Sequence, residues 1–267
     1  MAMSTNSNFR YVVLKITLFL LEKFPFFNAL TLLMLLAERA AHESYPPINP
    51  KLVYINLVLF VGCGFLLSAK SFVKQASLIY AGQLLYFAFS YYTNSKFSYG
   101  HWQRIHMATR QIGCAGIYIL LADLLVKADQ GRYRVQADGM VPSRQQQRIG
   151  EILIGLYLFS YSCLLTSCGE HREAFLHHFW HSELMQYAMT AILLASAFCF
   201  ISGYFVKDMF ICVIPALILL TALIDCDIRY WTERQVHYWN QVRLLGDNVC
   251  AISGFIFFAS VSYSTIT

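Results

Sequence analysis

The stretch HWQRIHMATRQIGCAGIYILLA, residues 101–122, is echoed by YWNQVRLLGDNVCAISGFIFFA, residues 238–259. Each stretch begins with a ring-bearing residue, a tryptophan and an amide, continues with a cationic residue and a polar helical turn, and ends as an apolar run. A second echo lies upstream of each, because residues 71–74 read SFVK and residues 204–207 read YFVK. The same order of features written twice predicts two copies of one structural unit.

The composition indicates that most of the surface meets lipid. Of the 267 residues, 57% are hydrophobic and only 13% are charged, and the mean hydropathy is +0.49. A soluble domain carries roughly a quarter charged residues. The net charge of +5 is spread over the expected loops. This distribution argues against a nucleic-acid partner and fits the cationic flanks of spans that have the lipid bilayer as their partner.

Apolar runs separated by polar turns predict about eight membrane-spanning helices, since a crossing needs about 20 apolar residues. The expected spans are residues 11–37, 52–69, 76–92, 107–126, 149–167, 183–203, 210–224 and 244–261. Pro25 interrupts the first run, so it forms either one kinked span, which we expect, or an interfacial helix followed by a span. The predicted fold is an all-α polytopic integral membrane protein, built as two parallel four-helix repeats.

A long polar segment that contains Pro142 separates the two repeats. The predicted organisation is a disordered N-terminus (1–9), a first membrane repeat (10–126), a polar linker (127–148), a second membrane repeat (149–263) and a C-terminal tail (264–267). An even number of spans in each repeat gives both copies the same orientation and places both termini on one side. The cationic loops on that side favour cytosolic termini.

Two charged residues inside the predicted spans are the strongest candidates for a site. Aligning the two echoes places Arg110 opposite Asp247, each about two turns into its helix. Ionisable groups inside a membrane are costly, so they mark either function or helix association. We expect a buried ion pair between the repeats, acting either as a structural pin or as part of a binding site. Asp225, near the end of a span, is expected to lie at the membrane interface.

The starts of the two echoes predict anchors at the membrane interface. Trp102 with Gln103, and Trp239 with Asn240, combine an aromatic ring that favours head-group depth with an amide that can bridge or cap.

A histidine-rich stretch contains the one spacing that resembles a metal site. His177 and His181 are four residues apart, as zinc ligands on one helical face are. The stretch has no HExxH motif and no fixed third ligand. We therefore expect an amphipathic interfacial helix without a metal.

No linear motif in the chain indicates catalysis. The eight cysteines lie almost entirely in apolar runs and form no CxxC, so we expect free thiols packed as small apolar side chains. A glycine-rich phosphate loop, a nucleophile elbow and a catalytic-triad order are all missing from the sequence. We predict no cofactor and no enzymatic activity.

Several short motifs, in order and spacing, resemble the transmembrane protein 101 family. They are Leu36-Ala37-Glu38-Arg39-Ala40 before a proline-rich loop, then Leu176, His178, Glu183 and Leu184, and finally Trp239-Asn240-Gln241 with Leu244-Leu245-Gly246. The resemblance covers nearly the whole chain and departs from the family pattern at His177 and His181. It implies a multi-pass membrane protein linked to activation of NF-kappa-B signalling. Each half also resembles, in pattern, the four-helix units of the DoxX-like superfamily.

Three functions stay open from the sequence. We expect first a non-enzymatic scaffold, chaperone-like or signalling partner of membrane or secretory-pathway proteins, located in the endoplasmic reticulum or Golgi. The second is a small-molecule or lipid carrier whose site lies between the repeats, near Arg110 and Asp247. The third is a DoxX-like, redox-associated membrane protein, which the free cysteines allow.

Overall fold

A computed structural model of the chain describes residues 2–41, 50–93, 100–129, 144–178, 183–234 and 236–264. Every regular element in these ranges is helical, which confirms the all-α prediction. The elements are α1 (Ala2–Ala41), α2 (Pro50–Ser68), α3 (Val73–Thr93), α4 (His101–Asp129), α5 (Arg144–Ser167), α6 (Gly169–His178), α7 (Glu183–Ser202), α8 (Val206–Leu220), the π-helical turn η1 (Thr221–Asp225), α9 (Ile228–Glu233) and α10 (Tyr238–Ser264).

Six of these helices are long and apolar enough to cross a membrane. They are α1, α2, α5, α7, α8 together with η1, and α10. The expected spans at 76–92 and 107–126 form the long helices α3 and α4, which are not in this set. Multiple membrane-spanning helices are thus confirmed, whereas the count of eight is not. The position of α4 explains its lower hydropathy: from His106 to Ala122 only Ile112 is not buried, so the helix meets protein rather than lipid.

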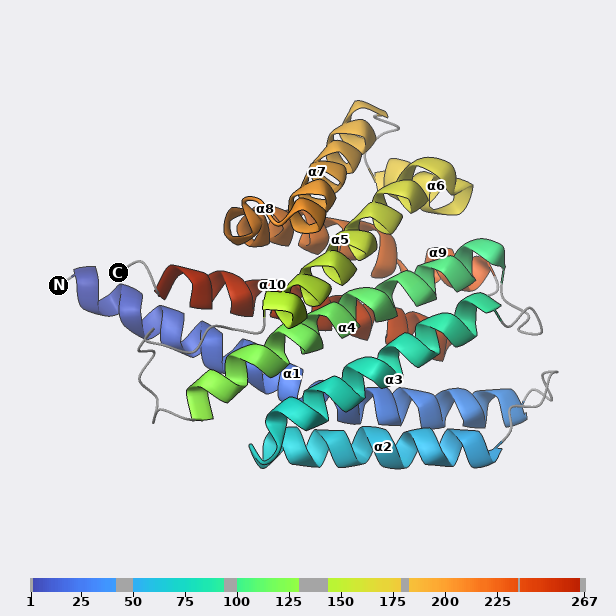
Figure 1. The fold of residues 1–267 in the computed structure, drawn as a ribbon. Coiled ribbons are helices and arrows are strands. Elements are labelled where there is room, and N and C mark those ends of the chain that lie inside the picture. The colour runs from blue at the N-terminus through green and yellow to red at the C-terminus, as the bar shows by residue number, and fades with distance from the viewer. Residues whose placement is uncertain are drawn as a thin grey trace.

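Helix α1 is a single helix with Pro25 in its interior. It changes direction part-way along its length (Figure 1), as expected where proline removes a backbone hydrogen bond. The helix also begins at Ala2, so residues 2–9, for which the sequence predicts disorder, are helical. Adding turns to an existing helix is much less costly than nucleating one, and no proline or glycine interrupts residues 2–9.

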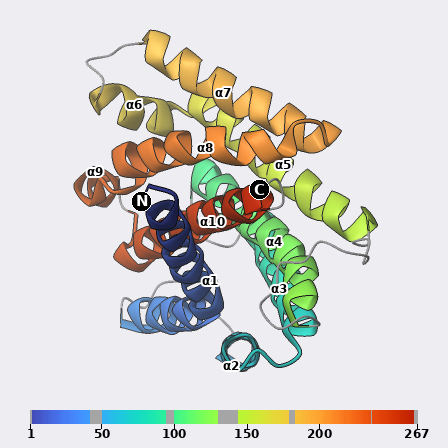
Figure 2. The ribbon, with the colours of Figure 1, turned by 90° about the vertical axis from the view of Figure 1, so that its left-hand side faces the viewer.

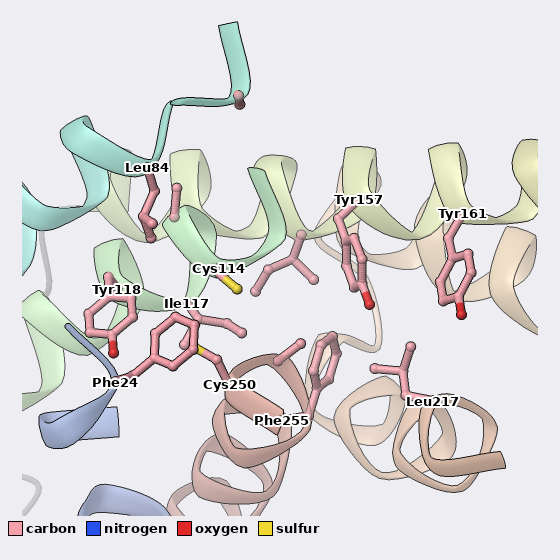
Figure 3. Packing of buried hydrophobic residues seen from close by; sticks show 14 of the residues in the cluster. Phe24, Leu84, Cys114, Ile117, Tyr118, Tyr157, Tyr161, Leu217, Cys250 and Phe255 are labelled. Atoms are coloured by element: carbon pink, nitrogen blue, oxygen red, sulfur yellow. The ribbon is translucent and has the colours of Figure 1, made fainter. Parts of the chain in front are cut away.

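Helices α4 and α10, which carry the two echoed stretches, form the centre of the bundle. Helix α4 packs against α3, α5 and α10, and α10 packs in addition against α1 and α8. In Figure 2, α10 and α4 lie between α7 and α8 on one side and α2 and α3 on the other. Figure 3 shows Cys114 and Ile117 of α4 facing Cys250 and Phe255 of α10 in the apolar core.

Glycine permits a close approach between α4 and α5. A Cβ atom on Gly116 would lie 2.9 Å from the carbonyl oxygen of Gly150, and one on Gly150 would lie 2.7 Å from Cγ of Leu120. Both distances are shorter than a van der Waals contact. Small residues at such crossings let membrane helices pack backbone to backbone, so α5 is held directly on the central helix.

Both chain termini lie at one end of the bundle, together with the tight turns that join α2 to α3 and α7 to α8 (Figure 1). Helices α6 and α9 lie at the opposite end. In the two turns, Phe72 and Phe205 both adopt left-handed backbone conformations, with φ of 51° and 56°. Gly203 has φ of 81°, a conformation that glycine adopts without a steric penalty.

Candidate functional site

A buried ionic network lies between α4, η1 and α10. Nη2 of Arg110 donates to both carboxylate oxygens of Asp225, at 2.9 and 2.8 Å. Nη1 donates to the backbone carbonyl of Leu244 at 3.0 Å, and Nε donates to Nε2 of His106 at 2.8 Å. Both charged side chains are buried. Each guanidinium nitrogen therefore has a partner, which is what a charge needs in a low-dielectric interior.

The π-helical turn η1 brings Asp225 into this network. It follows α8 directly, and its last residue is Asp225. Nε1 of Trp231 donates to the carbonyl oxygen of Ile224 at 2.6 Å, and the side-chain amide of Asn248 donates to Oδ2 of Asp225 at 2.7 Å. Short π-helical turns occur frequently at functional positions. Asp225 is the last residue of its candidate span, as predicted, but its carboxylate is buried inside the bundle rather than exposed to the head groups, because this turn and its partners hold it there.

The predicted pairing of Arg110 with Asp247 differs from the observed one. Both residues are buried where α4 meets α10, but Arg110 bonds Asp225. Asp247 instead accepts a hydrogen bond from the side chain of Gln111, at 2.6 Å, and its backbone carbonyl accepts from Sγ of Cys114 at 3.5 Å. Gln111, the residue next to Arg110, is thus the partner of Asp247. The alignment of the echoes found both charged residues but not the third element that contributes Asp225.

A chain of hydrogen bonds leads from Arg110 to the end of the bundle that carries α6. Nε2 of His171 lies 3.1 Å from Nδ1 of His106, and Nδ1 of His171 lies 3.6 Å from Sγ of Cys168. The thiol of Cys168 in turn contacts Oε2 of Glu170 at 3.2 Å. Neutral imidazoles satisfy these contacts if each carries its proton on Nδ1, since His106 then accepts from Arg110 and donates to His171.

Sequence reasoning missed this histidine pair. His106 lies one helical turn before Arg110, and that spacing is a usable signal, because side chains four residues apart share a helix face. His171 lies on α6 and offers no comparable signal. Its ring packs against Trp102 and Trp231, with centroids 5.4 and 5.3 Å away. Only the packing of α6 on the spans brings the two imidazoles together.

Burial of His171 predicts a loss of stability in acid. Burial, and secondarily the positive charge of Arg110, lower the pKa of His171 from 6.5 to about 3. Below pH 6.5, His171 therefore binds a proton in the unfolded chain but stays neutral in the folded protein. The free energy of unfolding should fall by about 1.4 kcal/mol per pH unit from this group, until the pH approaches its folded-state pKa.

This expectation is measured by the melting temperature of the detergent-solubilised protein between pH 7.5 and 4.5. His171→Gln should make the acid slope shallower, whatever its effect on stability at neutral pH. The matched control is His177→Gln on the same helix, since His177 is exposed and should leave the slope unchanged. An unchanged slope in His171→Gln would contradict the prediction.

The thiol of Cys168 is not poised as a nucleophile. Burial, with the carboxylate of Glu170 contributing, raises its pKa from 9.0 to about 11. Burial also raises the pKa of the Cys226 thiol. Redox and catalytic cysteines instead have lowered pKa values, because the thiolate is the reactive form. These two thiols therefore lend no support to a redox function.

A second buried cation, Arg243, was not singled out from the sequence. It lies on α10 one turn before Asp247, and its guanidinium carbon is 5.1 Å from the ring centroid of Phe87 and 5.4 Å from that of Tyr91. None of its three side-chain nitrogens has a hydrogen-bond partner among the described residues. Two aromatic faces and a carboxylate one turn away favour the charge at this position.

The predicted anchors are partly or fully buried within the protein. Trp102 is partly buried, and its ring packs 5.1 Å from that of Trp231. Trp239 is also partly buried, and its ring lies 5.6 Å from that of Tyr238. The amides Gln103 and Asn240 are buried inside the protein. Both amides thus face other helices, since α4 and α10 occupy the centre of the bundle.

The predicted metal candidates stay separate from the network. His177 is exposed at the end of α6, whereas His181 lies outside the described residues. The neighbouring His178 lies 3.7 Å from the carboxylate of Asp227. In the ranges that the structure describes, no three histidine, cysteine, aspartate or glutamate side chains are grouped as metal ligands would be.

The sequence of the chain matches a known protein family. The model of the TMEM101 protein family matches residues 7–261. The match includes both echoed stretches and every residue of the ionic network. A search of the solved structures finds no match. Because the family model covers nearly the whole sequence, the chain belongs to the TMEM101 protein family.

Proposed function

We propose that the protein is a non-enzymatic multi-pass membrane protein that acts as a scaffold, chaperone-like or signalling partner of other membrane or secretory-pathway proteins. The observation that carries this proposal is the closed ion pair between Arg110 and Asp225 at the centre of the bundle. The cavity beside it, lined in part by Trp102 and Trp231, measures about 10 Å³. Ligand pockets typically measure about 300–1,000 Å³, so the site favours a structural pin over cargo binding.

We also propose that the bundle is built from two four-helix repeats, α1–α4 and α5–α10. Each repeat's first long helix packs on the last helix of the other, α1 on α10 and α5 on α4. The matching residues Phe72 and Phe205 share the same left-handed conformation. Ile117 and Gly254 occupy the same position in the two echoes and also face each other, since a Cβ on Gly254 would lie 2.6 Å from Ile117. Contacts between equivalent positions of the two repeats support a twofold symmetry relation between them.

The proposed location is an endomembrane, with both termini in the cytosol. Lys70, Lys74 and Lys207 lie in or beside the two tight turns at the end that carries the termini. The positive-inside rule counts such cations in short loops. At the other end, the acidic residues Glu170 and Glu173 lie on α6.

The test uses proximity labelling by an enzyme fused to the C-terminus of the full chain, followed by co-purification and native mass spectrometry. The key variant is Arg110→Met/Asp225→Leu, which removes both charges but keeps apolar volume. If the pair is a structural pin, the folded double variant should label and co-purify the same proteins as the wild type. Labelling of cytosolic proteins would support the proposed cytosolic location of the C-terminus. An NF-kappa-B reporter in the same cells tests the proposed signalling role.

Two results would overturn the scaffold proposal. In the first, the wild-type protein co-purifies with a stoichiometric metabolite but with no protein partner, and the folded double variant loses that metabolite. In the second, the wild-type protein labels and co-purifies no protein partner, whereas a folded double variant that loses its partners would overturn only the structural-pin role of the ion pair. Each variant's folding is checked by size-exclusion chromatography and by its melting temperature.

A further inference from the structure

A cavity separate from the ionic network lies at the end of the bundle that carries both termini. Its volume is about 440 Å³, within the range of ligand-binding pockets. Its lining comes from the end of α4, the beginning of α5, the turn between α7 and α8, and the end of α10. The spans α5 and α8 begin at this level and α10 ends there, so the cavity lies at the depth of lipid head groups.

The inner wall of the cavity is apolar. Leu120, Phe210 and Phe258 line it, and all three side chains belong to the buried core. A ligand that reaches this wall must present an apolar portion to it, since apolar surface is the part that gains from leaving water. A free polar metabolite therefore fits less well than an amphipathic molecule.

The rim carries charges of both signs. Lys207 and Asp208 are adjacent and exposed in the first turn of α8, and neither has an ion pair or hydrogen bond with another described residue. Glu151 lines the cavity as well, but it is already bonded by Gln147 at 2.8 Å and by Arg148 at 3.4 Å. Asp123 lines the cavity too and also has an interaction of its own, so the charges at the rim that are left for a ligand are the adjacent cation and anion of Lys207 and Asp208.

We propose that this cavity binds the head group of a zwitterionic phospholipid with a primary ammonium group, such as phosphatidylethanolamine. The ammonium group has three N–H donors, which can reach the carboxylate of Asp208 and a free lone pair of Glu151. The lipid phosphate meets the ammonium of Lys207, and the glycerol and upper acyl carbons lie on the wall formed by Leu120, Phe210 and Phe258. A trimethylammonium head group has no N–H donor, and the anionic phosphatidylglycerol head group has no ammonium group to meet Asp208.

The chain contains a matched control for this site. The turn between α2 and α3 has the same SFVK-like sequence and the same left-handed phenylalanine, with Lys74 in the position of Lys207. The residue that follows is Gln75 in place of Asp208. This turn thus presents an exposed cation at the same end of the bundle without the carboxylate.

The experiment is a titration of the delipidated full-length protein in detergent by native mass spectrometry. The probes are phosphatidylethanolamine, phosphatidylcholine and phosphatidylglycerol with identical acyl chains. Phosphatidylethanolamine should bind about tenfold more tightly than phosphatidylcholine, since a hydrogen bond to a charged group contributes about 1.5–3 kcal/mol and 1.4 kcal/mol is a factor of ten. Asp208→Asn should abolish this preference, Lys207→Gln should weaken both lipids, and the control Lys74→Gln should change neither.

Equal affinities for phosphatidylethanolamine and phosphatidylcholine would overturn the proposal, as would an Asp208→Asn variant that keeps the preference. Tighter binding of phosphatidylglycerol than of phosphatidylethanolamine would indicate a simple cationic surface and would overturn it too. All three substituted residues are exposed, so their variants should fold, and melting temperatures check this. The scaffold proposal is tested separately, because Arg110→Met/Asp225→Leu should keep the lipid at this cavity.

Discussion

Asp225→Ala should lower the free energy of unfolding by about 3–5 kcal/mol, because it removes one partner of a buried ion pair. Arg110 would keep its bonds to Leu244 and His106 but would lose both charge-assisted bonds to the carboxylate. The amide of Asn248 would lose its acceptor as well. A buried guanidinium without a counter-charge is among the most costly states that a single substitution can create.

Thermal and denaturant unfolding of the purified protein in detergent measure this loss. Arg110→Met/Asp225→Leu should be more stable than either single variant, since removing both charges leaves neither one uncompensated. The surface control is Glu233→Ala, which breaks an exposed pair with Arg229 at 3.3 Å and should cost less than about 1 kcal/mol. A cost for Asp225→Ala no larger than that of Glu233→Ala would show that the buried pair does not hold the bundle together.

Gly116→Leu should separate α4 from α5. Even the Cβ atom of a new side chain would lie 2.9 Å from the carbonyl oxygen of Gly150 and 3.1 Å from Cβ of Leu153. Neither atom can rotate away, because one is backbone and the other is fixed to it. Overpacking typically costs about 1–3 kcal/mol. We expect Gly116→Ala to fall in this range and Gly116→Leu to exceed it.

The matched control is Gly62→Leu on α2. Gly62 is exposed, and a Cβ atom there would meet nothing within 4 Å. That substitution should leave stability unchanged or raise it, since glycine in a helix costs about 0.5–1 kcal/mol relative to alanine. The comparison uses melting temperatures and the yield of monodisperse protein. Equal stability of Gly116→Leu and Gly62→Leu would contradict the close crossing of α4 and α5.

Part of the candidate site was accessible from sequence. Repetition of the echoed stretches singled out Arg110 and Asp247, and both are buried where α4 and α10 meet. The same alignment missed Asp225, because an acidic residue at the end of an apolar run looks like an interfacial group. It also missed His171, whose partner His106 lies 65 residues away on another helix.

The sequence by itself determined the helical class, the positions of the long helices and the family. These properties follow from local patterns: apolar runs of membrane length, the prolines and polar turns between them, and motifs in a fixed order. Only the tertiary structure decided which charges pair. The carboxylate on Arg110 comes from a residue 115 positions away, and the π-helical turn after α8 sets its direction. Hydropathy describes one segment at a time, whereas an ion pair depends on how three segments meet.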